Sequence, residues 1–420
     1  MQQFKKYDKY KDSGLDWLGD VPSGWEIKRL KDLIMFCDYG TSESTFPDGE
    51  IEILGMGEIK DGKIYYPKKS FLMQVEPRLL LKKGDILYTR TNGSIELIGK
   101  AGLIEEEISN VSFASYLVRL RHTKSTNPKF LNYLLNSLSF REKAKSISIS
   151  TAQNNLSSSK YIQLNIATQN INLQIKIAEF LDTQTDTIDA EIELLTTKAA
   201  KYKQLKQSLI NKVVTKGLNP QATMKDTGID WIGSIPKGWE VRRLKDFVTF
   251  SIAGEVIDVS FWGEGQELMY SAGKEPVLCN YKDFPNRKRT TKNDILIARN
   301  GDGFIHIPIL NSIYTNVVQL VRLSLVVDRQ YLLYVLNTIK FHINQTSNGD
   351  FIASLNKTLW FNSNIPFPPK IEQIQITEYL DAKTGEIDRI ITAINDKISK
   401  LKQYRKVLIN DVVTGKINVE

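Results

Sequence analysis

A segment of 23 residues occurs twice in this chain, and this repeat constrains the fold more than any other feature. Residues 11–33 read KDSGLDWLGDVPSGWEIKRLKDL, and residues 225–247 read KDTGIDWIGSIPKGWEVRRLKDF. Fourteen of the 23 positions are identical at an offset of 214, and most of the others are conservative exchanges. Such self-similarity predicts two copies of one structural unit.

A second repeat closes each half of the chain. Residues 181–217 match residues 380–416 at an offset of 199 without a gap, whereas the segments between the two repeats match only weakly. Two globular domains are therefore predicted at residues 1–170 and 219–369, each followed by a long helix, at residues 171–218 and 370–420. A chain of 420 residues is long enough for this organisation.

The closing repeat has the spacing of a coiled coil, with apolar residues mostly three, four or seven positions apart. The predicted seam consists of Leu181, Ile188, Ile192, Leu195, Tyr202 and Leu209 in the first helix and Leu380, Ile387, Ile391, Ile394, Ile398, Leu401 and Leu408 in the second.

Charge along the helices predicts how they pair. Residues 179–193 contain six acidic residues and no basic one, and residues 198–216 contain six lysines and no acidic one. The second helix also carries its basic residues late. Antiparallel pairing would place each acidic front against a basic back, so we expect an intramolecular antiparallel coiled coil. The alternative is two separate amphipathic helices, each packed on its own domain.

The divergent middles have the pattern of mixed α/β domains, which makes the expected fold class α+β. Short β-rich runs at residues 85–88, 116–120, 294–298 and 317–323 alternate with turn sequences such as Asn92-Gly93. One helix is predicted in each half, at residues 128–145 and 329–344.

Composition excludes several classes of protein. Hydrophobic residues make up 41% and charged residues 25%, which is typical of a globular chain. No run of 18 apolar residues and no secretory signal is present, so a cytoplasmic protein without a membrane span is expected. Two cysteines and three histidines are too few for a zinc cluster or a disulfide framework.

Catalytic motifs are largely missing from the sequence. The nearest approach to a phosphate-binding loop, residues 94–101, lacks the first glycine and the final hydroxyl. Pro47-Asp48 followed by Glu58-Ile59-Lys60 has the order of a magnesium-dependent nuclease motif, but the second half has no counterpart. Structural roles are expected for the histidines and cysteines, and neither a catalytic residue nor a metal or cofactor site is predicted in this chain.

Basic clusters and polar loops favour a nucleic-acid partner, in keeping with the net charge of +8. Lysine and arginine can neutralise phosphates, and Asn, Gln and Arg can contact base edges. The candidate DNA-binding residues are Lys68, Lys69, Arg90, Thr91, Asn92, Thr151, Gln153, Asn154, Lys274, Arg287, Lys288, Arg289, Arg299, Asn300 and Asn348. A solvated basic face and ordinary turn chemistry remain the alternatives for each cluster and loop.

With these motifs in place, the chain resembles the specificity subunit of type I restriction–modification systems. The resemblance rests on the repeated start motif, on residues 84–90 (GDILYTR), and on residues 365–381 (IPFPPKIEQIQITEYLD) leading into the second helix. It covers essentially the whole chain. Two departures occur: residues 166–170 read IATQN where residues 365–369 read IPFPP, and Asn293 stands where the first half has Gly84.

The resemblance implies a non-catalytic subunit with two target-recognition domains, each of which reads one half of a split, asymmetric site in double-stranded DNA. The helices would act as a ruler and dock two methyltransferase subunits, with restriction/translocase subunits in the full complex. S-adenosylmethionine, ATP and Mg²⁺ would then be held by the partner subunits. The seam is about 50 Å long, which corresponds to at most about 15 base pairs.

Two other classes of function remain as alternatives. One is a catalytic nuclease or methyltransferase chain with built-in recognition domains, and the other is a coiled-coil scaffold that binds only protein.

Overall fold

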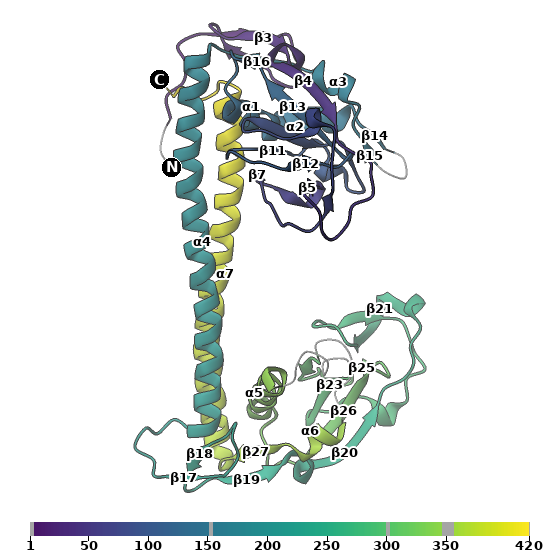
Figure 1. Ribbon diagram of the computed structural model, residues 1–420. Coiled ribbons are helices and arrows are strands. Elements are labelled where there is room, and N and C mark those ends of the chain that lie inside the picture. Colours follow the sequence, from purple (N-terminus) through teal and green to yellow (C-terminus); the bar gives the residue numbers. More distant parts are fainter. Residues whose placement is uncertain (1–3, 151–153, 300–302, 347–356, 420) are drawn as a thin grey trace. The chain divides into compact units, whose positions relative to one another are not determined.

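The computed structural model describes residues 4–150, 154–299, 303–346 and 357–419. The chain forms two compact units (Figure 1). Unit 1 contains Met1–Leu195 and Asp396–Glu420, and unit 2 contains Thr196–Asn395. Each unit therefore combines a globular part with segments of both long helices. Within the described residues, no helix is long and apolar enough to cross a membrane.

The globular part of unit 1 is built on a mixed six-stranded sheet together with several smaller sheets. The large sheet has the order β4 (Ile34–Tyr39), β13 (Leu117–His122), β9 (Asp85–Thr89), β11 (Ala101–Leu103), β7 (Gly62–Ile64) and β6 (Ile59–Lys60). The smaller sheets are β12 (Val111–Phe113) with β5 (Ile51–Leu54) and β8 (Phe71–Leu72), β1 (Tyr10–Asp12) with β2 (Asp20–Pro22), β3 (Glu26–Arg29) with β16 (Asn165–Thr168), and β10 (Thr91–Asn92) with β15 (Asn154–Asn155) and β14 (Ile149–Ser150). The helices are α1 (Pro128–Asn136), α2 (Leu138–Ser146) and α3 (Ser158–Ile162).

Unit 2 repeats this plan with shorter sheets. Its main sheet has the order β20 (Val248–Ala253), β26 (Val318–Leu323), β23 (Asp294–Ala298) and β24 (Ile305–His306). The other strands are β22 (Val277–Cys279), β21 (Trp262–Tyr270) and β25 (Ile313–Tyr314) in one sheet, β17 (Met224–Asp226) with β18 (Ser234–Pro236), and β19 (Glu240–Arg243) with β27 (Asn364–Phe367). The helices of its globular part are α5 (Arg329–Thr346) and α6 (Lys357–Asn362).

The order of β4, β13, β9 and β11 in unit 1 is the order of β20, β26, β23 and β24 in unit 2. An ion pair at the same place in both sheets, Arg121 with Asp85 and Arg322 with Asp294, shows that the correspondence extends to side chains. The predicted fold class, two repeated mixed α/β domains with two long paired helices, is confirmed.

The two long helices, α4 (Ile171–Lys216) and α7 (Lys370–Val413), pair antiparallel within each unit. In unit 1, Asp189 and Glu191 of α4 form ion pairs with Arg405 and Lys397 of α7, at 2.9 and 2.6 Å. As residue numbers rise along α4, the numbers of the partners on α7 fall. In unit 2, Lys206 of α4 pairs with Asp388 of α7 at 2.6 Å. The acidic front of each helix thus meets the basic back of the other, as predicted.

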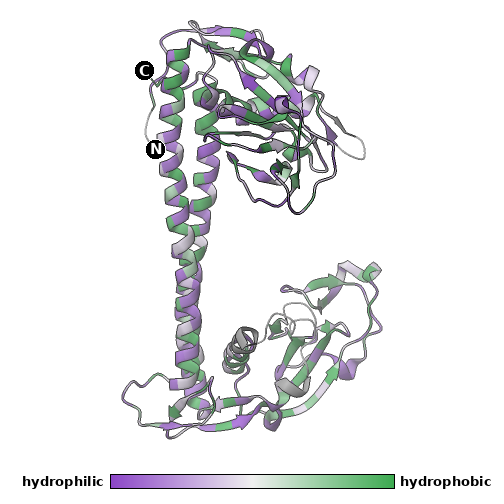
Figure 2. Ribbon diagram, viewed as in Figure 1, coloured by the Kyte–Doolittle hydropathy of each residue, from purple (hydrophilic) through white to green (hydrophobic). Residues whose placement is uncertain are grey.

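The seam predicted from the sequence is shielded from solvent. All of its residues are buried or half-buried, and Leu181 and Leu380, which correspond at the offset of 199, are fully buried. In contrast, Leu194 and Leu205, which fall outside the seam, are 68% and 54% exposed. Both helices alternate hydrophobic and hydrophilic residues along their length (Figure 2). Each fully buried Leu or Ile contributes about 1.5–3 kcal/mol, whereas an exposed ion pair contributes at most about 1 kcal/mol. Burial therefore provides the stability, and the charges select the direction.

The repeated start motif packs against the C-terminal end of a long helix. In unit 2, Gly217 at the end of α4 lies against Trp239 of the start motif. In unit 1, the equivalent Trp25 and Pro22 lie against Gly415, at the end of α7. Both glycines have positive φ, +71° and +77°, which stops each helix at the point of contact. Each start motif therefore receives the helix that begins in the other unit.

The single helix predicted over residues 128–145 is wrong in one respect, because it is broken into α1 and α2. Ser137 adopts an extended conformation between them (φ −66°, ψ 152°), and its hydroxyl donates to the Leu134 carbonyl. Beyond the break, the main-chain N–H and the hydroxyl of Ser139 both donate to Asn410 Oδ1 of α7. This contact with α7 could not be predicted from the local sequence.

Gly415→Ala is predicted to destabilise the protein by at least about 2 kcal/mol, because it combines a left-handed backbone with a steric clash. The new Cβ would lie 2.3 Å from Pro22 Cδ. The matched control is Gly385→Ala, inside α7, where a Cβ meets nothing within 4 Å. The free energy of unfolding of that variant should increase by about 0.5–1 kcal/mol, because Ala is more stable than Gly inside a helix. Chemical denaturation measures the free energy of unfolding of both variants. Equal changes in the two variants would contradict the close packing of Gly415 against the start motif.

Candidate nucleic-acid interface

Arg90 of unit 1 emerges at the end of β9, where its side chain is held by an aromatic ring. Its main-chain N–H donates to the Tyr116 carbonyl at 2.9 Å, which fixes the backbone beside β13. The guanidinium lies over the Tyr39 ring, 4.9 Å from the centroid, and Nε is buried without a hydrogen bond. Tyr39 and Tyr116 are themselves about half exposed. A cation on a ring, beside a second exposed aromatic, suits contact with nucleic acid.

Two loops that the sequence analysis singled out meet beside Arg90. Thr91 and Asn92 form β10, which pairs with Asn154 and Asn155 of β15. Asn92 Oδ1 accepts from the Ser94 N–H at 2.9 Å, and the Asn154 amide donates to the carbonyls of Asn92 and Gly93. Both amides are therefore used in the turn, which agrees with the turn-chemistry alternative. The candidates Thr151 and Gln153 lie outside the described residues.

Unit 2 places Arg299 at the position of Arg90. Its N–H donates to the Val317 carbonyl at 2.8 Å, as Arg90 does to Tyr116, and its side chain is exposed. Ala253 stands where unit 1 has Tyr39, so this arginine has no aromatic ring at that position. The neighbouring candidates Asn300 and Asn348 lie outside the described residues.

The densest basic cluster of the sequence, residues 287–289, is divided by the fold. Lys288 forms an ion pair with Glu255 at 2.5 Å, and Arg289 forms two hydrogen bonds to Glu267, at 2.7 and 2.9 Å. The hydrogen bonds from Arg289 lower the pKa of Glu267. Arg287, in contrast, is exposed. Two of the three cations are thus neutralised within the chain, and Arg287 is the member best placed to contact a phosphate.

Three further lysine candidates lie on the surface. Lys69 and Lys274 are exposed. Lys68 is also exposed, in a left-handed conformation (φ +51°) that the hydrogen bond from its N–H to Glu52 Oε1 stabilises.

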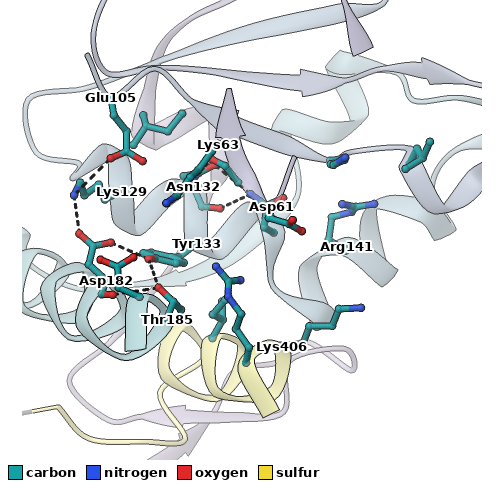
Figure 3. Close-up of a pocket in the computed structure, with 18 of the residues that line it drawn as sticks. Asp61, Lys63, Glu105, Lys129, Asn132, Tyr133, Arg141, Asp182, Thr185 and Lys406 are labelled. Carbon is teal, nitrogen blue, oxygen red and sulfur yellow. Dashed lines mark hydrogen bonds and ion pairs between the residues drawn. The ribbon is translucent and has the colours of Figure 1, made fainter. Parts of the chain in front are cut away.

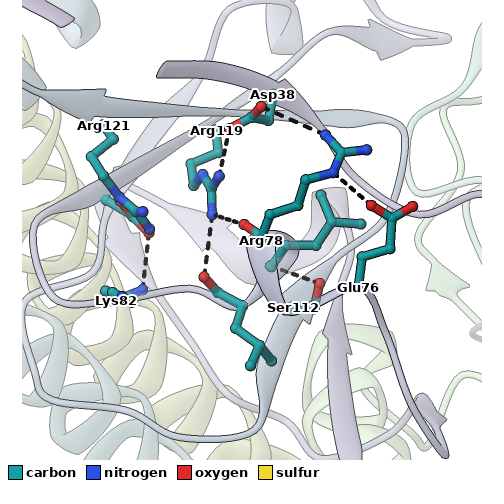
Figure 4. A network of polar contacts seen from close by, with 10 residues as sticks. Asp38, Glu76, Arg78, Lys82, Ser112, Arg119 and Arg121 are labelled. Atoms are coloured by element: carbon teal, nitrogen blue, oxygen red, sulfur yellow. Dashed lines mark hydrogen bonds and ion pairs between the residues drawn. The ribbon is translucent and has the colours of Figure 1, made fainter. Parts of the chain in front are cut away.

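A smaller basic cluster, around Arg119 and Arg121, has a structural role (Figure 4). Arg119 is only 2% exposed and donates to Asp38 and to the carbonyls of Arg78 and Leu80. Arg121 makes two hydrogen bonds of 2.6 Å to the buried Asp85. Arg119 thus ties the sheet to the segment before β9, and Arg121 links β13 to β9 within the sheet.

The nuclease-like motif is not assembled as a metal site. Asp48 accepts a hydrogen bond from the Gly49 N–H, and Glu58 accepts one from the Gly55 N–H, both at 2.9 Å. Among the residues that the structure describes, no group of three or more His, Cys, Asp or Glu side chains could hold a metal ion. Burial raises the pKa of the Cys37 thiol to about 11, which disfavours a reactive thiolate, and burial lowers the pKa of His306.

Sequence reasoning missed a polar junction that fixes each globular part on its long helix. In unit 1, the Tyr133 hydroxyl donates to Asp182 of α4 at 2.8 Å and lies 3.2 Å from Thr185 (Figure 3). Lys129 contacts the same carboxylate at 2.6 Å. These side chains line one end of a cavity of about 340 Å³, which also contains Arg141.

The same junction recurs in unit 2. The Tyr334 hydroxyl donates to Asp381 at 2.6 Å and lies 3.3 Å from Thr384. Burial raises the pKa of Tyr334 to about 12, so its hydroxyl remains a donor at neutral pH. The signal was present in the sequence, because Asp182 and Thr185 recur as Asp381 and Thr384 at the offset of 199.

Comparison with known proteins gives one consistent result. The family model described as "Type I restriction modification DNA specificity domain" matches residues 22–198 and 236–400. The type I restriction enzyme MjaX specificity subunit of Methanocaldococcus jannaschii is 27% identical over 440 residues, covering 100% of this chain and 99% of that protein. The StySPI specificity subunit of Salmonella potsdam is 20% identical, with coverages of 96% and 91%.

Solved structures share the fold. A structure described under complex assembly and conformational transition of the type I R-M system aligns with a TM-score of 0.72 at 17% identity, covering 94% of this chain and 98% of that one. The crystal structure of the HsdS subunit from Thermoanaerobacter tengcongensis aligns with a TM-score of 0.52 at 17% identity, with the same coverages.

Arg287→Ala is predicted to weaken binding to duplex DNA uniformly across sequences and to reduce the slope of log affinity against log salt by about one. The reason is the loss of one phosphate contact from an exposed cation. Fluorescence anisotropy at several salt concentrations measures both quantities. Lys274→Ala, which removes another exposed cation of unit 2, tests a second candidate in the same assay. An unchanged slope for Arg287→Ala would exclude this residue from the interface.

Proposed function

The chain belongs to the type I restriction modification DNA specificity family, and we propose that it binds a split, asymmetric DNA target whose two halves are each read by one unit. Proteins named as specificity subunits are the non-catalytic DNA-recognition components of these systems, so this chain recognises DNA and is not itself an enzyme. The catalytic alternative of the sequence analysis is therefore wrong.

The main observation behind the proposal is that the two units share one scaffold but differ in the surface residues that it presents. Both main sheets have the same strand order, and both place an arginine directly after an inner strand, Arg90 after β9 and Arg299 after β23. Around that arginine, however, the units differ. Tyr39 and Tyr116 of unit 1 correspond to Ala253 and Val317 of unit 2. Equal scaffolds with unequal surfaces support two half-sites of different sequence.

The paired helices support a fixed gap between the half-sites. Helices α4 and α7 are continuous over 46 and 44 residues. Because the seam and the ion pairs define one register, the helices resist sliding past each other. We therefore propose that they set the separation of the half-sites at about one turn of the duplex, with the gap itself unread.

The partners are proposed from the same family relationship. The chain would dock two methyltransferase subunits and, through them, restriction/translocase subunits. S-adenosylmethionine, ATP and Mg²⁺ would be bound by those subunits, and the assembly would act in the prokaryotic cytoplasm, where its DNA target lies.

A genome-wide map of methylated adenines, with and without this gene, tests the proposal. We expect methylation to disappear at a single motif with two different half-sites and an unread gap of about one helical turn or less. Restoring the gene on a plasmid should restore the motif, and replacing its residues 34–165 with the corresponding middle of a related chain should change only one half-site. A change in both half-sites, or a motif without a gap, would refute the division of labour between the units.

A further inference from the structure

The two repeated tryptophans have different hydrogen-bonding partners. In unit 2, the indole Nε1–H of Trp239 donates to Glu372 Oε2 at 2.8 Å. In unit 1, Trp25 is only 2% exposed, and its Nε1 makes no hydrogen bond. The difference follows from the sequence, because the position of Glu372 is occupied by Leu173 at the offset of 199. An indole N–H is a donor only, so what it lacks is an acceptor.

A second buried polar group lies beside Trp25. Gln169 is 8% exposed, and neither its Nε2 nor its Oε1 has a hydrogen-bond partner. At the corresponding position unit 2 has Pro368, which carries no polar side chain. Leaving two neighbouring buried groups without partners costs free energy. Such groups therefore mark a place where a polar ligand would be stabilised.

Trp25 and Gln169 line the same open cavity of about 420 Å³. Its wall also includes Leu173, and Asp8 and Lys9 lie in its lining as exposed residues. The cavity adjoins the N-terminus of α4, where Asn170 Oδ1 accepts a hydrogen bond from the Leu173 N–H at 3.0 Å.

The electrostatics of this helix end differ between the units. The first turn of α4 contains no acidic residue, whereas the first turn of α7 contains Glu372. A helix N-terminus favours a negative charge, and in unit 2 the chain supplies that charge itself. In unit 1 the first turn of α4 provides no negatively charged side chain to interact with the helix N-terminus.

We propose that this cavity of unit 1 is a carboxylate-binding site. The bound carboxylate would take the place that Glu372 fills in unit 2, accepting hydrogen bonds from Trp25 Nε1 and Gln169 Nε2, with Lys9 adding a positive charge. A planar monoanion suits the site better than a phosphate, because Asp8 lies in the same lining and opposes a second negative charge. The proposal is independent of DNA binding by the chain.

The experiment follows the indole N–H signals of the full-length chain, labelled with ¹⁵N at its six tryptophans, by NMR. Sodium acetate is titrated against sodium chloride at constant ionic strength. We expect acetate to move the Trp25 signal saturably and to leave the Trp239 signal in place. Gln169→Leu should weaken the acetate affinity about tenfold, the effect of one lost hydrogen bond to a charged group.

Two reciprocal variants provide the matched control. Leu173→Glu supplies unit 1 with its own carboxylate, so the Trp25 signal should move without acetate and no longer respond to it. Glu372→Leu opens the corresponding place in unit 2, so the Trp239 signal should acquire an acetate response. If Leu173→Glu fails to fold, the acetate responses of Gln169→Leu and Glu372→Leu still test the proposed site.

A third comparison identifies the source of the carboxylate. An end-blocked peptide with one Glu, compared with the same peptide carrying Gln, tests an acidic side chain of a partner protein. Tighter binding of the Glu peptide than of acetate assigns the site to a protein partner, and equal binding assigns it to a free carboxylate. Three results would overturn the proposal: no shift of Trp25, an equal shift with inorganic phosphate, or a response that appears only in Asp8→Asn.

Discussion

The antiparallel pairing of α4 and α7 is the interaction on which the rest of the structure depends. Neither helix can bury its apolar stripe alone, and the segments of α4 and α7 that lie in one unit are far apart in the sequence. Pairing solves both problems, because the beginning of one helix lies against the end of the other within each unit. The ion pairs of Arg405 with Asp189 and of Lys206 with Asp388 fix the direction in unit 1 and unit 2 respectively.

This exchange of helix ends explains which segments are repeated in the sequence. The start motif opens each half and the closing helix ends it, and these two segments are the most similar between the halves. The start motif and the closing helix meet in space, since Trp25 receives the end of α7 and Trp239 receives the end of α4. The junction of Tyr133 with Asp182, and of Tyr334 with Asp381, then fixes the position of each globular part on its helix. The surface around Arg90 and Arg299, in contrast, differs between the units, with Tyr39 in unit 1 where unit 2 has Ala253.

The sequence predicted the features that arise from periodic or local patterns. The repeat, the seam from Leu181 to Leu408 and the antiparallel direction follow from spacing and charge. The break at Ser137 was not predicted, and the contact that follows it, from Ser139 to Asn410, joins residues far apart in the chain. Likewise, Lys288 and Arg289 are a basic cluster in the sequence, but the fold gives them Glu255 and Glu267 as partners. Which charges remain available to a ligand is decided by tertiary structure.

The most direct test of the account is to cut the chain between the two halves without denaturing it. A protease site inserted at Pro220, in the exposed turn after α4, would divide the chain into its two sequence halves. One fragment would contain all of α4 and the other all of α7. Because each unit requires helix segments from both fragments, the cut protein should elute from a sizing column as one 1:1 complex and unfold in one transition. Fragments that separate and remain folded on their own would contradict the exchange of helix ends.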